Sequence, residues 1–132
     1  MLRPILLISN PTDSILQDKL KVALNQLGPL QIEPEENAIR AAIQGAHQII
    51  IVETCGVEDF SLLVARMRAH RPEARIIVTT ASPEWEDARE AFRSGATDYV
   101  NISLDMRELL ASLYKAQTGP TPYGLQEYSR RH

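Results

Sequence analysis

The chain has 132 residues, a common size for one domain, and its hydrophobic fraction of 44% is enough for one ordinary core. Its 14 basic and 17 acidic residues give a net charge of −3, so the composition does not support a surface that binds nucleic acid. The single cysteine excludes an internal disulfide and fits a reducing compartment.

Strand-like and helix-like segments alternate through the first half of the chain. A short strand is expected at 4–9, and a helix over 13–27 carries its apolar residues on one face until Gly28 and Pro29 stop it. Ser14 and Gln17 fit a capping box at its start. A weak strand at 30–33 precedes a helix within 34–45, and a run of β-branched residues over 49–52 predicts a buried strand.

The second half continues the same alternation. Apolar residues at helical spacing over 60–67 predict a third helix, and 75–80 predicts a fourth strand. The segment 82–95 reads as a helix with Ser82 as its N-cap, Pro83 in its first turn and Gly95 at its end. A fifth strand is expected at 98–102, before a last helix capped by Ser103 or Asp105.

Five strands and five helices in strict alternation predict an α/β fold. We expect a three-layer, doubly wound, five-stranded parallel sheet of the flavodoxin type, with strand order 2-1-3-4-5. This domain should span 1–117, and 118–132 has turn residues without periodicity, as in a linker or a disordered tail. The first apolar run, Ile5 to Ile8, is too short for a signal peptide or a membrane helix, so we expect a soluble, cytoplasmic protein.

The buried third strand runs directly into an acid, Glu53, at the sheet edge where open α/β folds bind their ligands. Glycine-rich phosphate loops do not follow the strands, so a nucleotide cofactor is not expected. Cys55 reads as a small, half-buried apolar residue, and the three histidines are too scattered to predict a metal centre. Asp13 is interpreted as a solvated acid that complements a helix dipole.

From about Arg3 to Ala116 the sequence resembles the receiver domain of two-component response regulators. Four segments carry the resemblance: "RPILLISN", "QIIIVE", "RIIVTTA" and "AFRSGATDYVNISLDMRELLASL". The resemblance implies a phosphoacceptor pocket formed by the equivalents of a few residues, namely Glu53, Ser9, Asn10, Thr80, Ala81 and Ile102. It also implies a switch and interaction face on the fourth helix, fifth strand and fifth helix, with Tyr99, Asp98, Arg93 and Arg107.

The departures from the family pattern fall on its chemistry. Ser9 and Asn10 replace the two acids that hold Mg²⁺, Glu53 replaces the phosphoacceptor aspartate, and Ile102 replaces a lysine. Phosphoryl transfer depends on positioning and charge neutralisation. These losses therefore predict a domain that is not phosphorylated and that binds neither Mg²⁺ nor another cofactor. Glu53 either points to water or imitates a phosphorylated aspartate by accepting a hydrogen bond from Thr80.

The sequence therefore predicts a non-enzymatic signalling module that acts by protein–protein contact. Its partner would be another protein or a second copy, bound through the fourth helix, fifth strand and fifth helix, and an output domain could follow the tail. Trp85 would be a core residue or an interface anchor. Two alternatives remain open: a working phosphoacceptor that uses Glu53, Asp13 or another acid, and a small-ligand sensor that uses the vestigial cleft.

Overall fold

The structure is a computed structural model that describes residues 2–10, 15–55, 57–102 and 106–119. Its strands are β1 (Ile5–Ile8), β2 (Leu30–Glu33), β3 (Ile49–Glu53), β4 (Arg75–Thr80) and β5 (Asp98–Asn101). Its helices are α1 (Ile15–Leu27), α2 (Ala38–Gln44), α3 (Phe60–His70), α4 (Trp85–Ser94) and α5 (Arg107–Thr118), with a 3-10 turn, η1 (Glu35–Asn37), before α2.

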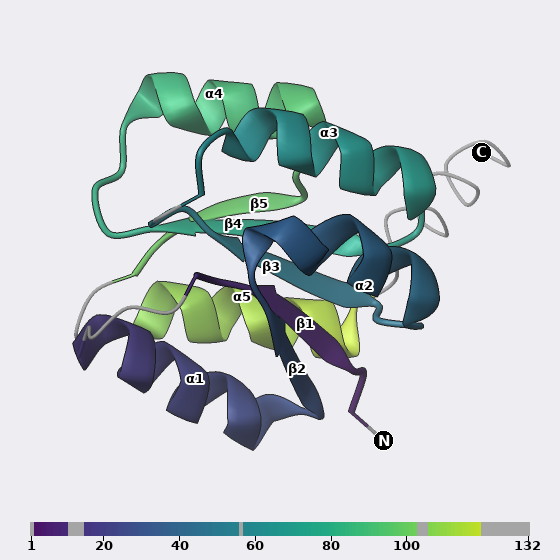
Figure 1. Ribbon diagram of the computed structural model, residues 1–132. Coiled ribbons are helices and arrows are strands. Elements are labelled where there is room, and N and C mark those ends of the chain that lie inside the picture. The colour runs from purple at the N-terminus through teal and green to yellow at the C-terminus, as the bar shows by residue number, and fades with distance from the viewer. Residues whose placement is uncertain (1, 11–14, 56, 103–105, 120–132) are drawn as a thin grey trace, which may run out of the picture.

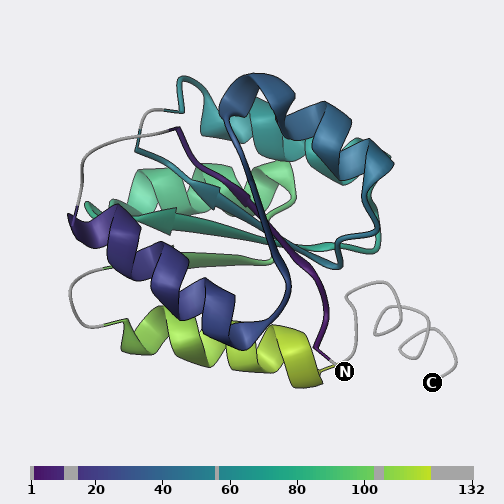
Figure 2. The same cartoon turned by 60° about the horizontal axis from the view of Figure 1, so that its bottom comes forward.

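The five strands form one parallel sheet with the order β2-β1-β3-β4-β5, as the sequence predicts. Helices cover both faces: α2, α3 and α4 lie on one side, and α1 and α5 lie together on the other (Figures 1 and 2). The prediction of a three-layer, doubly wound fold is therefore confirmed. All carboxyl ends of the strands point to the same edge of the sheet, because every strand pair is parallel.

Alternate residues of the central strands face the two helix layers. In β1, Leu6 and Ile8 pack with α2, α3 and α4, whereas Ile5 and Leu7 pack with α1 and α5. All four residues are fully buried, as in a parallel sheet that is covered on both faces. Each apolar helix face thus has its own core, and the layers hold the strand ends in fixed positions.

The predicted cap of the fourth helix is wrong. Helix α4 begins at Trp85, and its N-cap is Glu84 rather than Ser82. The backbone N–H of Ser82 donates instead to Thr80 Oγ1 at 3.1 Å, and Glu84 is extended, so 82–84 lie before the helix. Gly95 does close α4, with a φ of 114° that favours glycine.

Several sequence predictions fall outside the described residues. These are the capping box at Ser14, the orientation of Asp13 and the tail from 120 onward. The predicted cap of the last helix is wrong, because α5 begins at Arg107 and its N-cap is Met106 rather than Ser103 or Asp105. Helix α5 continues through Thr118, one residue past the expected boundary at 117. In the part of the chain that the structure describes, no helix has the length and apolar character needed to cross a membrane.

Candidate functional site

The candidate residues lie where the strands end, at one edge of the sheet. The register pairs Ile8 with Val52, Glu53 with Thr79, and Thr80 with Asn101. The side chains of Ser9, Glu53 and Thr80 are 3%, 5% and 7% exposed. Because these side chains are buried, the edge gives little support to the alternative of an open small-ligand cleft.

The turn after β1 is held by uncharged groups. Gln17 of α1 is buried, and its side-chain amide donates to Ser9 Oγ and, at 2.8 Å, to the carbonyl of Asn10. The side-chain oxygen of Asn10 accepts a hydrogen bond from the backbone N–H of Glu35 at 3.0 Å. Both residues that replace the expected acids are thus engaged within the chain.

Glu53 does not point to water, so that prediction is wrong. Its buried carboxylate folds into its own loop, where Oε1 accepts a hydrogen bond from the backbone N–H of Cys55 at 2.8 Å. Burial raises the pKa of the Glu53 carboxyl, and the hydrogen bond from Cys55 opposes part of that rise. Among the described residues no lysine or arginine pairs with Glu53.

The hydrogen bond proposed between Thr80 and Glu53 is absent, so this prediction is also wrong. The hydroxyl oxygen of Thr80 accepts a hydrogen bond from the N–H of Ser82, and its backbone carbonyl accepts one from Ile102 at 2.8 Å. The Ile102 side chain is buried in the core beneath α1 and α5. Ala81, the remaining pocket residue, is exposed.

These residues are a poor fit to Mg²⁺. That ion is usually held by one or two carboxylates together with water and substrate oxygens in octahedral geometry. Here the ends of the strands offer one carboxylate, Glu53, and one of its oxygens already accepts a hydrogen bond from the N–H of Cys55. The side-chain oxygens of Ser9 and Asn10 accept hydrogen bonds from uncharged groups. No cluster of three or more metal-ligating His, Cys, Asp or Glu residues occurs among the residues that the structure places.

Comparison with curated proteins gives two related transcriptional regulatory proteins. No protein-family model matches the chain. The transcriptional regulatory protein PhoP of Escherichia coli K12 is 30% identical over 105 residues, and its O157:H7 counterpart is 29% identical. Each match covers 76% of this chain and 47% of PhoP, so the chain spans about half the length of the curated relatives it matches.

Solved structures match nearly the whole fold. The BeF3-activated receiver domain of DrrB has a TM-score of 0.73 at 22% identity, covering 88% of this chain and 97% of that one. The Vibrio cholerae chemotaxis protein CheY4 has a TM-score of 0.73 at 18% identity, covering 88% and 99%. The chain has the fold of a response regulator receiver domain.

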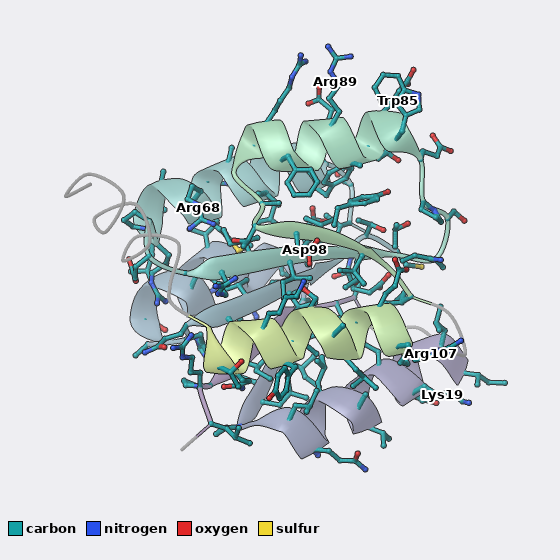
Figure 3. All side chains as sticks on the ribbon, turned by 180° about the vertical axis from the view of Figure 1, so that it is seen from behind. Lys19, Arg68, Trp85, Arg89, Asp98 and Arg107 are labelled. Atoms are coloured by element: carbon teal, nitrogen blue, oxygen red, sulfur yellow. The ribbon has the colours of Figure 1, made fainter. Side chains whose placement is uncertain are left out.

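In this receiver fold, Tyr99 and Asp98 lie on β5 between α4 and α5. Tyr99 is half-buried against the core, and its hydroxyl accepts a long hydrogen bond of 3.4 Å from the N–H of Glu84. The Asp98 carboxylate, which lies beside α5 (Figure 3), accepts a 2.6 Å hydrogen bond from Ser112 Oγ. It accepts another, of 2.9 Å, from the backbone N–H of Tyr99. The aspartate therefore ties β5 to α5 rather than standing free.

The outer side of α4 in the receiver fold carries an aromatic and basic stripe. Trp85 is 71% exposed and Phe92 50% exposed, and the Arg89 guanidinium lies 5.7 Å from the Trp85 ring centroid. Trp85 and Arg89 project away from the sheet (Figure 3), and Arg93 is exposed one turn after Arg89. Trp85 is thus exposed rather than a core residue, and Phe92 is a surface aromatic that the sequence analysis did not single out.

Three further residues complete the account of the sequence candidates. Cys55 is exposed, not half-buried as predicted, and it lies two residues beyond the end of β3. His47 is buried over Gly45, and Arg107 begins α5 near the end of α1 that carries Lys19 (Figure 3). The signal that could have revealed Gln17 is its position between Leu16 and Leu20 on the buried face of α1.

Proposed function

We propose that this chain is a receiver-type signalling module that acts by protein–protein contact, without phosphorylation of an acidic residue and without Mg²⁺. The observation that carries the proposal is the state of Glu53. Its carboxylate is buried, hydrogen-bonded to its own loop, and without a cationic partner among the described residues. A phosphoryl group on Glu53 would add negative charge, and no cationic side chain among the described residues pairs with Glu53 to neutralise it.

The turn after β1 supports the same proposal. In place of a charged ion site, the Gln17 amide supplies hydrogen-bond donors to Ser9 and Asn10. An amide is a weak substitute for a divalent cation, since it carries no net charge to offset a phosphoryl group. A structure of a Burkholderia pseudomallei response regulator with a phosphorylated aspartic acid has a TM-score of 0.69 at 23% identity, covering 86% of this chain and 68% of that one. The sequence resemblance to receiver domains implies that Glu53 is the equivalent of such an aspartate.

The test is intact-mass spectrometry after incubation with acetyl phosphate and Mg²⁺. We expect no gain of a phosphoryl group over time, with a far-UV circular dichroism spectrum that shows folded protein. A matched variant that combines Ser9→Asp, Asn10→Asp, Glu53→Asp, Ile102→Lys and Gln17→Leu serves as a control for whether the fold can hold the chemistry. A time-dependent phosphoryl gain by the unchanged chain would overturn the proposal and favour the phosphoacceptor alternative.

The partner would bind the face formed by α4, β5 and α5. Trp85, Phe92 and Arg93 give this face the residue types that dominate interface energies, whereas Asp98 and Tyr99 mainly connect it to the body. The partner is another protein or a second copy of the chain, and an output domain beyond 132 would be the nearest candidate. Loss of a co-purifying partner in Trp85→Ser, with retention in Ile43→Ser on α2, would support this face; retention in both would contradict it.

A further inference from the structure

Helix α1 carries an apolar stripe that faces solvent. Ile15 is 72% exposed and Val22 60% exposed, and they lie seven residues apart on one side of the helix. The opposite side, with Leu20 and Leu24, is buried against the sheet. The stripe therefore points away from the body of the domain, on the face where α1 and α5 run side by side (Figure 2).

A shallow groove of about 400 Å³ runs beside this stripe. It is lined by Ile15, Asp18, Lys19, Val22, Ala23, Gln26 and Met106. Leu110 and Tyr114 on neighbouring α5 are also exposed. Single exposed apolar residues are ordinary, but several apolar residues that line one groove make that groove a candidate interaction site.

Two opposite charges flank the stripe. At about 100° per residue, Asp18 and Lys19 fall on opposite sides of the line from Ile15 to Val22. Both are exposed, and neither forms an ion pair or side-chain hydrogen bond with any residue in the described ranges. The stripe is therefore apolar along its centre, acidic on one flank and basic on the other.

We propose that this stripe binds the same stripe of a second copy of the chain, with the two α1 helices parallel about a two-fold axis. In that arrangement Ile15 meets Ile15 and Val22 meets Val22, while Asp18 of each copy faces Lys19 of the other. The apolar pairs then lie at the centre of the seam, and the opposite charges lie on its two flanks.

The flanking charges select this orientation. A two-fold axis along the helices exchanges the two flanks, so each acid meets a base. An antiparallel pair keeps each flank on its own side, so Asp18 would face Asp18 and Lys19 would face Lys19. The seam is thus complementary to itself in one orientation, which is why a second copy is the occupant to expect.

The test is sedimentation equilibrium over a concentration series up to roughly 1 mM, a range in which weak self-association is measurable. We expect a monomer–dimer equilibrium whose Kd rises at least about tenfold in Val22→Lys, since the variant buries two lysines at the seam. The matched control is Ile43→Lys, because Ile43 is a similar apolar residue, 53% exposed, on α2 on the far side of the sheet.

Charge exchange tests the orientation. Asp18→Lys and Lys19→Asp should each raise Kd by about three- to tenfold, because each replaces two attractive contacts by repulsive ones. The double variant should return Kd to near its original value. In a Cys55→Ser background, Gln26→Cys should form a disulfide-linked dimer, and Ile43→Cys should not.

Three results would overturn the inference: a monomer throughout the series, a dimer that Val22→Lys leaves unchanged, or a double variant no better than the single ones. A dimer that Trp85→Ser disrupts and Val22→Lys does not would place self-association on the α4 face instead. Failure here leaves the mass-spectrometric test of the proposed function unaffected, since α1 self-association and phosphorylation are measured separately.

Discussion

The side-chain amide of Gln17, on α1, donates a hydrogen bond to the hydroxyl oxygen of Ser9 at the end of β1, and both side chains are buried. The same amide donates to the carbonyl of Asn10. A buried donor with two acceptors fixes the helix to the strand end, since unpaired polar groups at this depth are costly. These hydrogen bonds therefore attach the start of α1 to the end of β1.

Replacing Gln17 with alanine should destabilise the domain. The variant removes donors from two acceptors and leaves a cavity, so the free energy of unfolding should fall by about 2 to 4 kcal/mol. Urea denaturation followed by circular dichroism measures the change. Gln26→Ala, at an exposed position of the same helix, is the control and should change stability by less than about 0.5 kcal/mol. Equal effects of the two variants would contradict the role assigned to Gln17.

Replacing Glu53 with glutamine should change how stability depends on pH. Burial raises the folded-state pKa of Glu53 above its ordinary value of 4.5, so the stability it contributes is fully present below pH 4.5 and lost as pH rises through the folded pKa. Glutamine keeps an oxygen for the Cys55 N–H and carries no charge. At neutral pH the variant should therefore be more stable than the unchanged chain, and the difference should shrink toward pH 4.

Denaturant unfolding at pH 4, 5, 6 and 7 measures that difference. Glu86→Gln, on the exposed part of α4, is the control for a general loss of one negative charge. A stability difference that stays constant over the whole range would show that Glu53 titrates alike in the folded and unfolded chain.

His47 should make the domain less stable in mild acid. Burial lowers the pKa of His47 below 6.5, and the nearby Arg71 charge lowers it further. The unfolded chain then binds a proton more readily, so stability is present above pH 6.5 and lost as pH falls through the folded pKa. His47→Phe should flatten the pH dependence of Tm over this window, whereas exposed His70→Phe should not. An unchanged slope in His47→Phe would exclude this histidine as the source.

Arg68 should be the most costly arginine to replace on α3. Its guanidinium donates to the carbonyls of Gly95 and Ala74 at 3.0 and 2.6 Å, and also to those of Arg71 and Pro72. Arg68→Met removes the guanidinium donors from these carbonyls, so the free energy of unfolding should fall by about 2 to 4 kcal/mol. Arg66→Met, at an exposed position of the same helix, should cost under about 1 kcal/mol by the same denaturation assay.

The strand order and the helix layers could be predicted from the hydrophobic pattern of the sequence. Short uninterrupted apolar runs such as 5–8 and 49–52 are typical of strands buried on both faces, and their alternation with helical segments favours a parallel sheet. The position of Glu53 at a strand end follows from the same pattern.

The contacts of the site could not be predicted in the same way. Gln17 stands at helical spacing with Leu20 and Leu24 on the buried face of α1, but a polar residue type does not reveal which groups satisfy its amide there. The partner of Glu53 is a backbone N–H two residues later, which depends on the conformation of one loop. Likewise, Ser82 suits a helix cap by residue type, but its N–H is held by Thr80 and the helix begins later.

The hydrogen-bond network that joins Gln17, Ser9 and Asn10 is made of groups that carry no net charge. Interactions of this kind are screened little by salt and do not titrate between acid and alkali. The attachment of α1 to the end of β1 should therefore persist over a wide range of salt concentration and pH. Any self-association through α1 would then start from a helix whose position stays the same under those conditions.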